Sequence, residues 1–128
     1  MNKRLWVLQG LLAAAFLAHG LLFLFPSPEM AAMMNAFLAP AFRRFLGVAE
    51  VLAAIGLTLP GVTRIATWLV PTAAAGLMIV MIGAVISHIS RGEVSSAITT
   101  AILFALLTFV AYMRWRVLPI LPRGNRDR

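Results

Sequence analysis

Residues 45–60, with the sequence FLGVAEVLAAIGLTLP, place a single carboxylate, Glu50, inside an otherwise apolar run. The nearest charged residues along the chain are Arg44 on one side and Arg64 on the other. The whole chain is 62% hydrophobic and only 12% charged, well below the roughly 25% charged content of soluble domains. These features indicate a membrane protein with Glu50 at membrane depth. An ionisable side chain there is costly, so it normally faces the bundle interior and has a partner.

Four apolar segments of helical length predict four membrane spans within one domain, residues 1–128. About 20 apolar residues cross the hydrocarbon core as a helix. The predicted fold class is all-α, an integral membrane antiparallel four-helix bundle. The pair Pro60-Gly61 predicts the turn after the second helix, and Pro71 predicts a kink in the third. The expected helices and the basic tail that follows them cover residues 5–25, 40–59, 65–88, 96–113 and 114–128.

The segment between the first two spans predicts a short amphipathic helix on the extracytoplasmic side. Pro28 suits the first position of a helix, and Glu29 in that first turn complements the helix dipole. Apolar residues then recur on one helical face, namely Met30, Met33, Met34, Phe37 and Leu38. The segment is too short to span a bilayer, so we expect it to lie in the membrane interface.

The basic residues predict the orientation of the chain. Four spans put both termini on one side, together with Lys3, Arg4, Arg64, Arg114, Arg116, Arg123, Arg126 and Arg128. The other side receives Arg43, Arg44 and Arg91. The positive-inside rule therefore predicts a multi-pass protein of the cell (inner) membrane with cytoplasmic termini. The basic residues flank apolar runs and form no basic face with interleaved aromatics, which argues against nucleic-acid binding.

Polar side chains are expected at similar depth near the extracytoplasmic ends of the spans. Arg43, Gly47 and Glu50 share one face of the second helix, and Gly47 leaves room for Arg43 to reach toward the carboxylate. We predict a ligand-binding pocket formed by Glu50, His88, His19, Arg43 and Arg91. In this pocket Glu50 would accept or carry a proton and His88 would donate a hydrogen bond. Arg43 or Arg91 would hold an anionic form of the ligand.

Two interpretations of Glu50 stay open from the residues alone. The carboxylate can pair with His88, His19 or Arg43 simply to hold the bundle together, although such contacts are worth only about 0.6–2 kcal/mol in membranes. Alternatively, it forms a pocket for the head of an amphipathic molecule, such as a quinone, whose tail lies in lipid. His19, Glu50 and His88 are acceptable metal ligands by type, but no close spacing supports a metal site.

Small residues mark candidate helix contacts. Gly47, Gly76 and Gly83 are expected to pack against other helices, and a stripe in the first span repeats every four residues, at Gly10, Ala14 and Ala18. The chain has no cysteine, which excludes disulfides, thiolate metal sites and a dithiol relay. We therefore expect no intrinsic cofactor, and redox work would require a bound molecule such as a quinone.

Three segments resemble the DoxX-like family of small four-helix integral membrane proteins. They are FLGVAEVLAAIGLTLPG at residues 45–61, GLMIVMIGAVISHISRGE at residues 76–93 and AYMRW at residues 111–115. The resemblance is specific at three places: Gly47 with Glu50, Ile55-Gly56-Leu57 with Pro60-Gly61, and Met81-Ile82-Gly83-Ala84 leading to His88. It implies a four-helix membrane fold.

The resemblance implies two kinds of function. The family is similar to membrane subunits of a thiosulfate:quinone oxidoreductase, and other relatives associate with oxidative-stress enzymes, which implies quinone contact and a redox-enzyme partner. A distant branch resembles a chaperone for channel assembly, which implies a non-enzymatic scaffold for another membrane protein. The leading hypothesis is a membrane subunit or partner in redox metabolism, and the alternative is a scaffold or assembly chaperone. Membrane lipid is the expected surrounding partner, and enzyme activity and homo-oligomerisation stay open.

Overall fold

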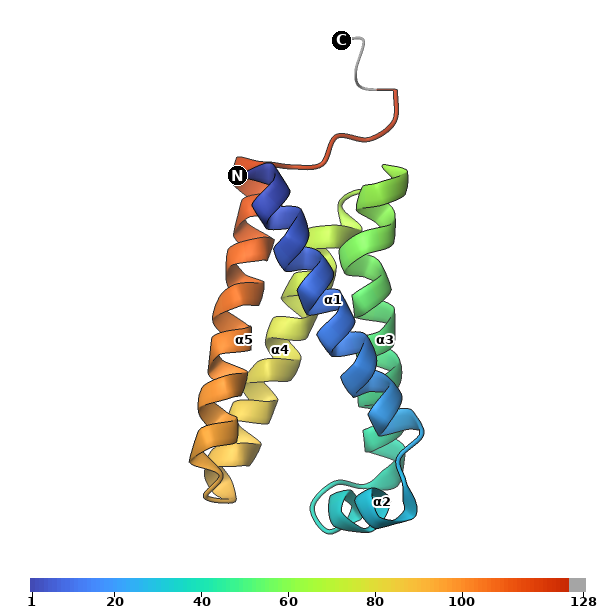
Figure 1. Ribbon diagram of the computed structural model, residues 1–128, viewed down its shortest axis with the longest axis vertical. Coiled ribbons are helices and arrows are strands. Elements are labelled where there is room, and N and C mark those ends of the chain that lie inside the picture. Colours follow the sequence, from blue (N-terminus) through green and yellow to red (C-terminus); the bar gives the residue numbers. More distant parts are fainter. Residues whose placement is uncertain (125–128) are drawn as a thin grey trace.

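The computed structural model describes residues 1–124, and its ordered elements are all helical (Figure 1). They are α1 (Asn2–Leu24), α2 (Pro28–Asn35), α3 (Pro40–Thr63), α4 (Leu69–Ser90), α5 (Val94–Tyr112) and a π-helical turn, η1 (Met113–Val117). Four helices are long and apolar enough to cross a membrane, namely α1, α3, α4 and the continuous segment Val94–Val117. The predicted all-α membrane bundle is confirmed. The tail residues Arg126 and Arg128 lie outside the described part.

The four long helices form two antiparallel pairs (Figure 1). α1 packs mainly on α3, α4 packs mainly on α5, and the contact between α3 and α4 joins the pairs. We call the end where α1 begins and α5 finishes the terminal end, and the opposite end, with α2 and the α4–α5 turn, the α2 end. The two pairs diverge toward the α2 end in Figure 1.

Proline and serine define where the short helix and α3 begin. Ser27 caps α2 with its side-chain oxygen, which accepts a hydrogen bond from the Met30 amide at 3.2 Å. Pro28 opens α2 and Pro40 opens α3. A proline suits a first helical position because the amide missing there would have no partner within the helix. The predicted short helix between the first two spans is therefore present, at Pro28–Asn35.

Most helix boundaries differ from the expected ones by one to three residues, and three places differ more. α3 continues through Pro60 to Thr63 and ends with Arg64 in the left-handed conformation, φ 59°. A membrane helix tolerates an internal proline because the freed backbone group can be satisfied by neighbours. α4 consequently begins later than predicted, at Leu69, so Pro71 lies in its first turn, where the missing amide costs little. The last span continues as η1 into the predicted basic tail.

The interior is a narrow apolar core, and most other large apolar side chains point outward. Leu57 of α3, Val70 of α4 and Leu107 of α5 are fully buried. By contrast, Ile79 is 71% exposed and Val62 is 68% exposed. Exposed apolar side chains in such number indicate a surface that contacts lipid.

The backbones of α1 and α3 pack closely at Gly20 and Gly47. A Cβ atom added to Gly47 would lie 2.9 Å from Leu24 Cγ and 3.0 Å from the Gly20 carbonyl oxygen. The small-residue stripe predicted in α1 lies on another face, because Gly10 is exposed and a Cβ there would meet no atom within 4 Å. Glycine therefore brings the backbones of the two helices together at the α2 end, whereas at the terminal end Gly61 of α3 makes room for the Trp6 side chain of α1.

A Gly47→Leu substitution should destabilise the bundle by about 1–3 kcal/mol, because the added side chain meets the α1 backbone, which cannot move aside without separating the helices. Unfolding by heat or denaturant in detergent micelles measures this effect. The matched control is Gly10→Leu, which adds the same side chain in open space and should leave stability unchanged. Equal unfolding midpoints for the two variants would contradict the proposed α1–α3 contact.

Candidate functional site

Glu50 of α3 is buried and pairs with His19 of α1. The distance between Glu50 Oε2 and His19 Nδ1 is 2.7 Å. Only 2% of the Glu50 side chain is exposed, whereas 49% of the His19 side chain is exposed. Of the three partners considered from the sequence, the structure therefore selects His19. The carboxylate is enclosed while the imidazole reaches the surface of the bundle.

The glycine contact between α1 and α3 positions this pair. His19 precedes Gly20, and a Cβ added to Gly20 would lie 3.2 Å from Glu50 Cβ, so the helices bring the two side chains to the same level. The imidazole also packs on Phe23, with ring centroids 4.4 Å apart and an interplanar angle of 41°. The Phe23 ring on one side and the carboxylate at Nδ1 together restrict the orientation of the imidazole.

The pair leaves one nitrogen of His19 available. When Nδ1 donates to the carboxylate, Nε2 is an acceptor in the neutral ring and a donor in the imidazolium. No side chain or backbone group of residues 1–124 forms a hydrogen bond with His19 Nε2. The arrangement can therefore exchange a hydrogen bond, and a proton, with a polar group outside the bundle.

Arg43 is buried near this pair but contacts a different group. It is 4% exposed, and its Nη1 donates a hydrogen bond to the carbonyl oxygen of Phe23. The last carbonyls of a helix have no partner within the helix, so this bond satisfies the end of α1. The expected reach of Arg43 toward Glu50 is therefore replaced by a connection between α1 and the first turn of α3.

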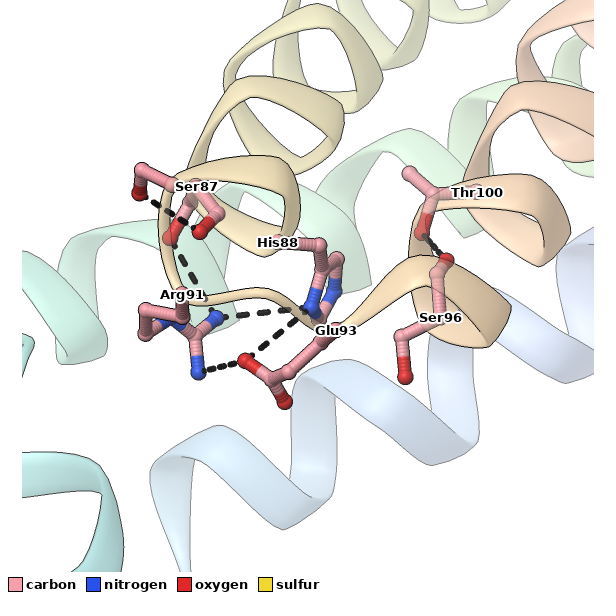
Figure 2. Close-up of polar contacts among 7 residues, drawn as sticks. Ser87, His88, Arg91, Glu93, Ser96 and Thr100 are labelled. Carbon is pink, nitrogen blue, oxygen red and sulfur yellow. Dashed lines mark hydrogen bonds and ion pairs between the residues drawn. The ribbon is translucent and has the colours of Figure 1, made fainter.

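His88 and Arg91 lie at the α4–α5 turn, together with Glu93 (Figure 2). Arg91 forms an ion pair with Glu93, and His88 Nδ1 lies 3.6 Å from Glu93 Oε1. Arg91 Nη2 lies 3.3 Å from the Ser87 hydroxyl. We call these four side chains the α4–α5 turn cluster. The turn itself needs a positive φ, which Gly92 supplies at 73°.

The α4–α5 turn cluster also contacts the segment after α2. The Arg91 guanidinium carbon lies 3.7 Å from the centroid of the Phe37 ring, a cation–π contact. Since Phe37 follows α2 directly, this contact connects the α4–α5 pair to the chain that joins α1 to α3. It therefore links the two helix pairs at the end where they diverge.

The residues predicted to form one pocket thus lie in two groups at the α2 end. His19, Glu50 and Arg43 belong to the α1–α3 pair, whereas His88 and Arg91 belong to the α4–α5 turn cluster. Within residues 1–124, no hydrogen bond or ion pair joins the groups, and no three metal-ligating side chains converge. Their roles as ligand contacts stay predictions.

The three glycines predicted to pack against helices have different surroundings. Gly47 contacts α1, as described above. Gly76 and Gly83 of α4 are exposed, and a Cβ added to either would meet no atom within 4 Å. Their surface faces away from the other helices of this chain.

A second polar network, at the terminal end, was not anticipated from the sequence. Gln9 is fully buried and donates to the Leu57 carbonyl at 2.8 Å. Arg114 Nε donates to Gln9 Oε1 at 2.6 Å, and Arg114 Nη1 donates to Asn2 Oδ1 at 2.9 Å. Arg114 is therefore part of the interior and not of an exposed basic tail. The available signal was Gln9 itself, an amide inside the apolar run of α1.

Four membrane-spanning helices with polar networks at both ends define a small multi-pass membrane protein. The chain belongs to the DoxX-like family, whose model matches residues 7–110. The family resemblance noted from the later segments is therefore confirmed, and it extends over α1. Comparisons with curated proteins and with solved structures gave no match.

Arg43→Met should lower stability by about 1–3 kcal/mol, because the variant keeps the apolar stem but loses the charged donor to the Phe23 carbonyl. The neighbouring Arg44→Met is the control, since Arg44 is exposed. Thermal unfolding in detergent distinguishes the two. If both variants unfold at the wild-type midpoint, Arg43 does not hold α1 to α3.

Proposed function

We propose that this DoxX-like protein binds the polar head of an amphipathic ligand, a quinone, at the His19–Glu50 pair and serves as a membrane partner in redox metabolism. The observation that carries the proposal is the 2.7 Å contact between His19 Nδ1 and Glu50 Oε2, with the acid buried and the imidazole half-exposed. Such a pair presents a proton-exchanging nitrogen at the surface of the bundle. His19 belongs to a helix long and apolar enough to span a membrane, so an apolar ligand tail can lie in the adjoining lipid.

The energetics favour a functional role over a purely structural one. Burying a carboxylate at membrane depth is expensive, and an interhelical polar contact returns only about 0.6–2 kcal/mol. The glycine contact at Gly20 and Gly47 already holds α1 against α3. Apolar residues at positions 19 and 50 would also let α1 pack on α3, without the free-energy cost of burying a charge.

The residues present suit the head of a quinone. When bound, a quinone supplies two-electron, two-proton redox chemistry. With Glu50 accepting a hydrogen bond from His19 Nδ1, Nε2 can donate to a carbonyl oxygen of the ligand when the ring carries a second proton. In the neutral ring, Nε2 can accept from a hydroxyl. The chain has no cysteine, so a partner protein would supply or receive the electrons.

The α2 end is assigned to the extracytoplasmic side in this proposal, and both termini to the cytoplasm of a cell (inner) membrane. Support comes from the basic residues of the described terminal end, namely Lys3, Arg4, Arg64, Arg114, Arg116 and Arg123. The α2 end has Arg43, Arg44 and Arg91, which Glu29 and Glu93 partly offset. This bias follows the positive-inside rule.

A second candidate function, a scaffold or assembly chaperone, is supported by a separate observation. Gly76 and Gly83 are exposed on one side of α4 with open space above them. Small residues spaced along a membrane helix allow another helix to approach closely. In this alternative, the surface around Gly76 and Gly83 docks a helix of another membrane protein.

Glu50→Gln and His19→Phe should each reduce retained quinone by about tenfold or more, since both remove the proton-exchanging pair while conserving shape. The measurement is organic extraction of protein purified in mild detergent, followed by mass spectrometry of quinones and lipids. Wild type should retain about one quinone per chain. Thermal unfolding of each variant shows that the bundle is intact.

The matched control is Glu29→Gln, which removes an exposed carboxylate of α2 and should retain quinone as wild type does. Bulk lipids alone, in equal amounts in wild type and all variants, would refute the quinone proposal. That result would favour the scaffold function.

The scaffold function predicts that a Gly76→Leu, Gly83→Leu double variant loses cross-linking to a neighbouring membrane protein in intact membranes. Its unfolding midpoint should remain that of wild type, because no atom of the bundle lies near either position. Glu50→Gln should keep the cross-link. A cross-linking pattern identical in wild type and the double variant would exclude docking at this surface.

A further inference from the structure

An open cavity of about 410 Å³ lies at the terminal end, where the α3–α4 turn meets the end of the last span. Thr67, Trp68 and Thr72 form one wall, and Arg114 and Trp115 contribute to the other. This volume is within the range of sites that hold small molecules or lipid head groups. The cavity is at the opposite end of the bundle from the His19–Glu50 pair.

The charged side chain in the cavity wall has unused hydrogen-bonding capacity. Arg114 is only 4% exposed, and its Nε and Nη1 donate to Gln9, Asn2 and the Leu118 carbonyl. Its Nη2 is buried and has no acceptor among residues 1–124. Buried donors are nearly always paired, and for a cation in a membrane protein the missing acceptor is a large cost.

No carboxylate of the described chain is near enough to supply that acceptor. The carboxylates within residues 1–124 are Glu29, Glu50 and Glu93, and all three belong to the α2 half of the bundle. The charged side chains of the described terminal end are all basic, among them Arg64 and Arg116. An acceptor from outside this part of the chain is therefore most stable if it is anionic, since a charge-assisted bond to guanidinium is the strongest available.

The remaining walls indicate what the anion is attached to. Trp68 and Trp115 are 64% and 63% exposed, and amphipathic indole rings favour the membrane–water interface. Trp6 packs beneath the guanidinium, with 5.0 Å between its ring centroid and Arg114 Cζ. A ligand here would have an anionic head beside Arg114 and an apolar body along the tryptophans.

We propose that this terminal cavity binds the head group of an anionic phospholipid, with a phosphate oxygen accepting a hydrogen bond from Arg114 Nη2. The acyl chains lie outside the cavity, along the lipid-facing surfaces of α4 and α5. The surrounding basic residues attract the same lipids over a longer range. The site is independent of the quinone proposal, because it uses none of the residues of the α2 end.

The test is native mass spectrometry of delipidated protein titrated with phosphatidylglycerol or with phosphatidylcholine of identical chains. Wild type should bind the first phosphatidylglycerol about tenfold more tightly than phosphatidylcholine, because the choline cation of the latter offsets the attraction of its phosphate to Arg114 and the surrounding basic residues. Arg114→Gln should abolish this preference. Since Arg114 also connects α1 to η1, a second variant, Thr67→Glu, introduces a carboxylate into the cavity wall and should abolish the preference in a folded bundle.

Ser95→Glu adds the same charge at the exposed start of α5, at the other end of the molecule, and should keep the preference. Equal affinity of wild type for the two lipids would overturn the proposal, as would an unchanged preference in folded Thr67→Glu. Inorganic phosphate provides a separate arm. If phosphate alone raises the unfolding midpoint as phosphatidylglycerol does at equal concentration, the site binds free phosphate and the lipid assignment is wrong.

Discussion

The close approach of α1 and α3 at Gly20 and Gly47 is the constraint on which the α2 end depends. Lipid tails are as apolar as leucine, so helices in a bilayer associate through close packing and polar contacts and not through apolar burial. The missing side chains let the backbones touch, and this contact brings the carboxylate of Glu50 to the imidazole of His19. The packing of α1 on α3 and the pairing of Glu50 with His19 therefore depend on the same contact. Separating the helices would expose the carboxylate to lipid and remove its partner at the same time.

The membrane spans could be predicted from sequence because few backbone structures can cross a bilayer. Long apolar segments must form helices there, and prolines at first positions mark where α2 and α3 begin. Helix ends are harder to predict, because a local sequence pattern does not show whether neighbouring groups can satisfy the backbone around an internal proline. Pro60 looks like a stop, yet α3 continues to Thr63 and delays the start of α4. Because α4 begins at Leu69, Pro71 lies in its first turn and does not form the predicted kink within the helix.

The site was predictable only in part. The burial of Glu50 follows from its own apolar flanks, but its partner depends on which helices are neighbours, and no single helix pattern contains that information. For the same reason, the sequence did not show that the small-residue stripe at Gly10 lies on a face of α1 away from α3. The role of Gln9 could not be predicted from the sequence, because its partner Arg114 is 105 residues away and only the fold brings the two side chains together.

α1 contributes one polar side chain to each end of the bundle, Gln9 to the Arg114 network and His19 to the Glu50 pair. These residues are separated by about 15 Å along the helix, with Leu12 and Phe16 of the apolar core between them. In each network the α1 side chain pairs with an ionisable residue of another element. Among residues 1–124, one nitrogen of each pair has no hydrogen-bond partner, namely Nη2 of Arg114 and Nε2 of His19. The same helix therefore supplies both networks, and the apolar core packed along it between residues 9 and 19 holds the two polar side chains at opposite ends of the bundle.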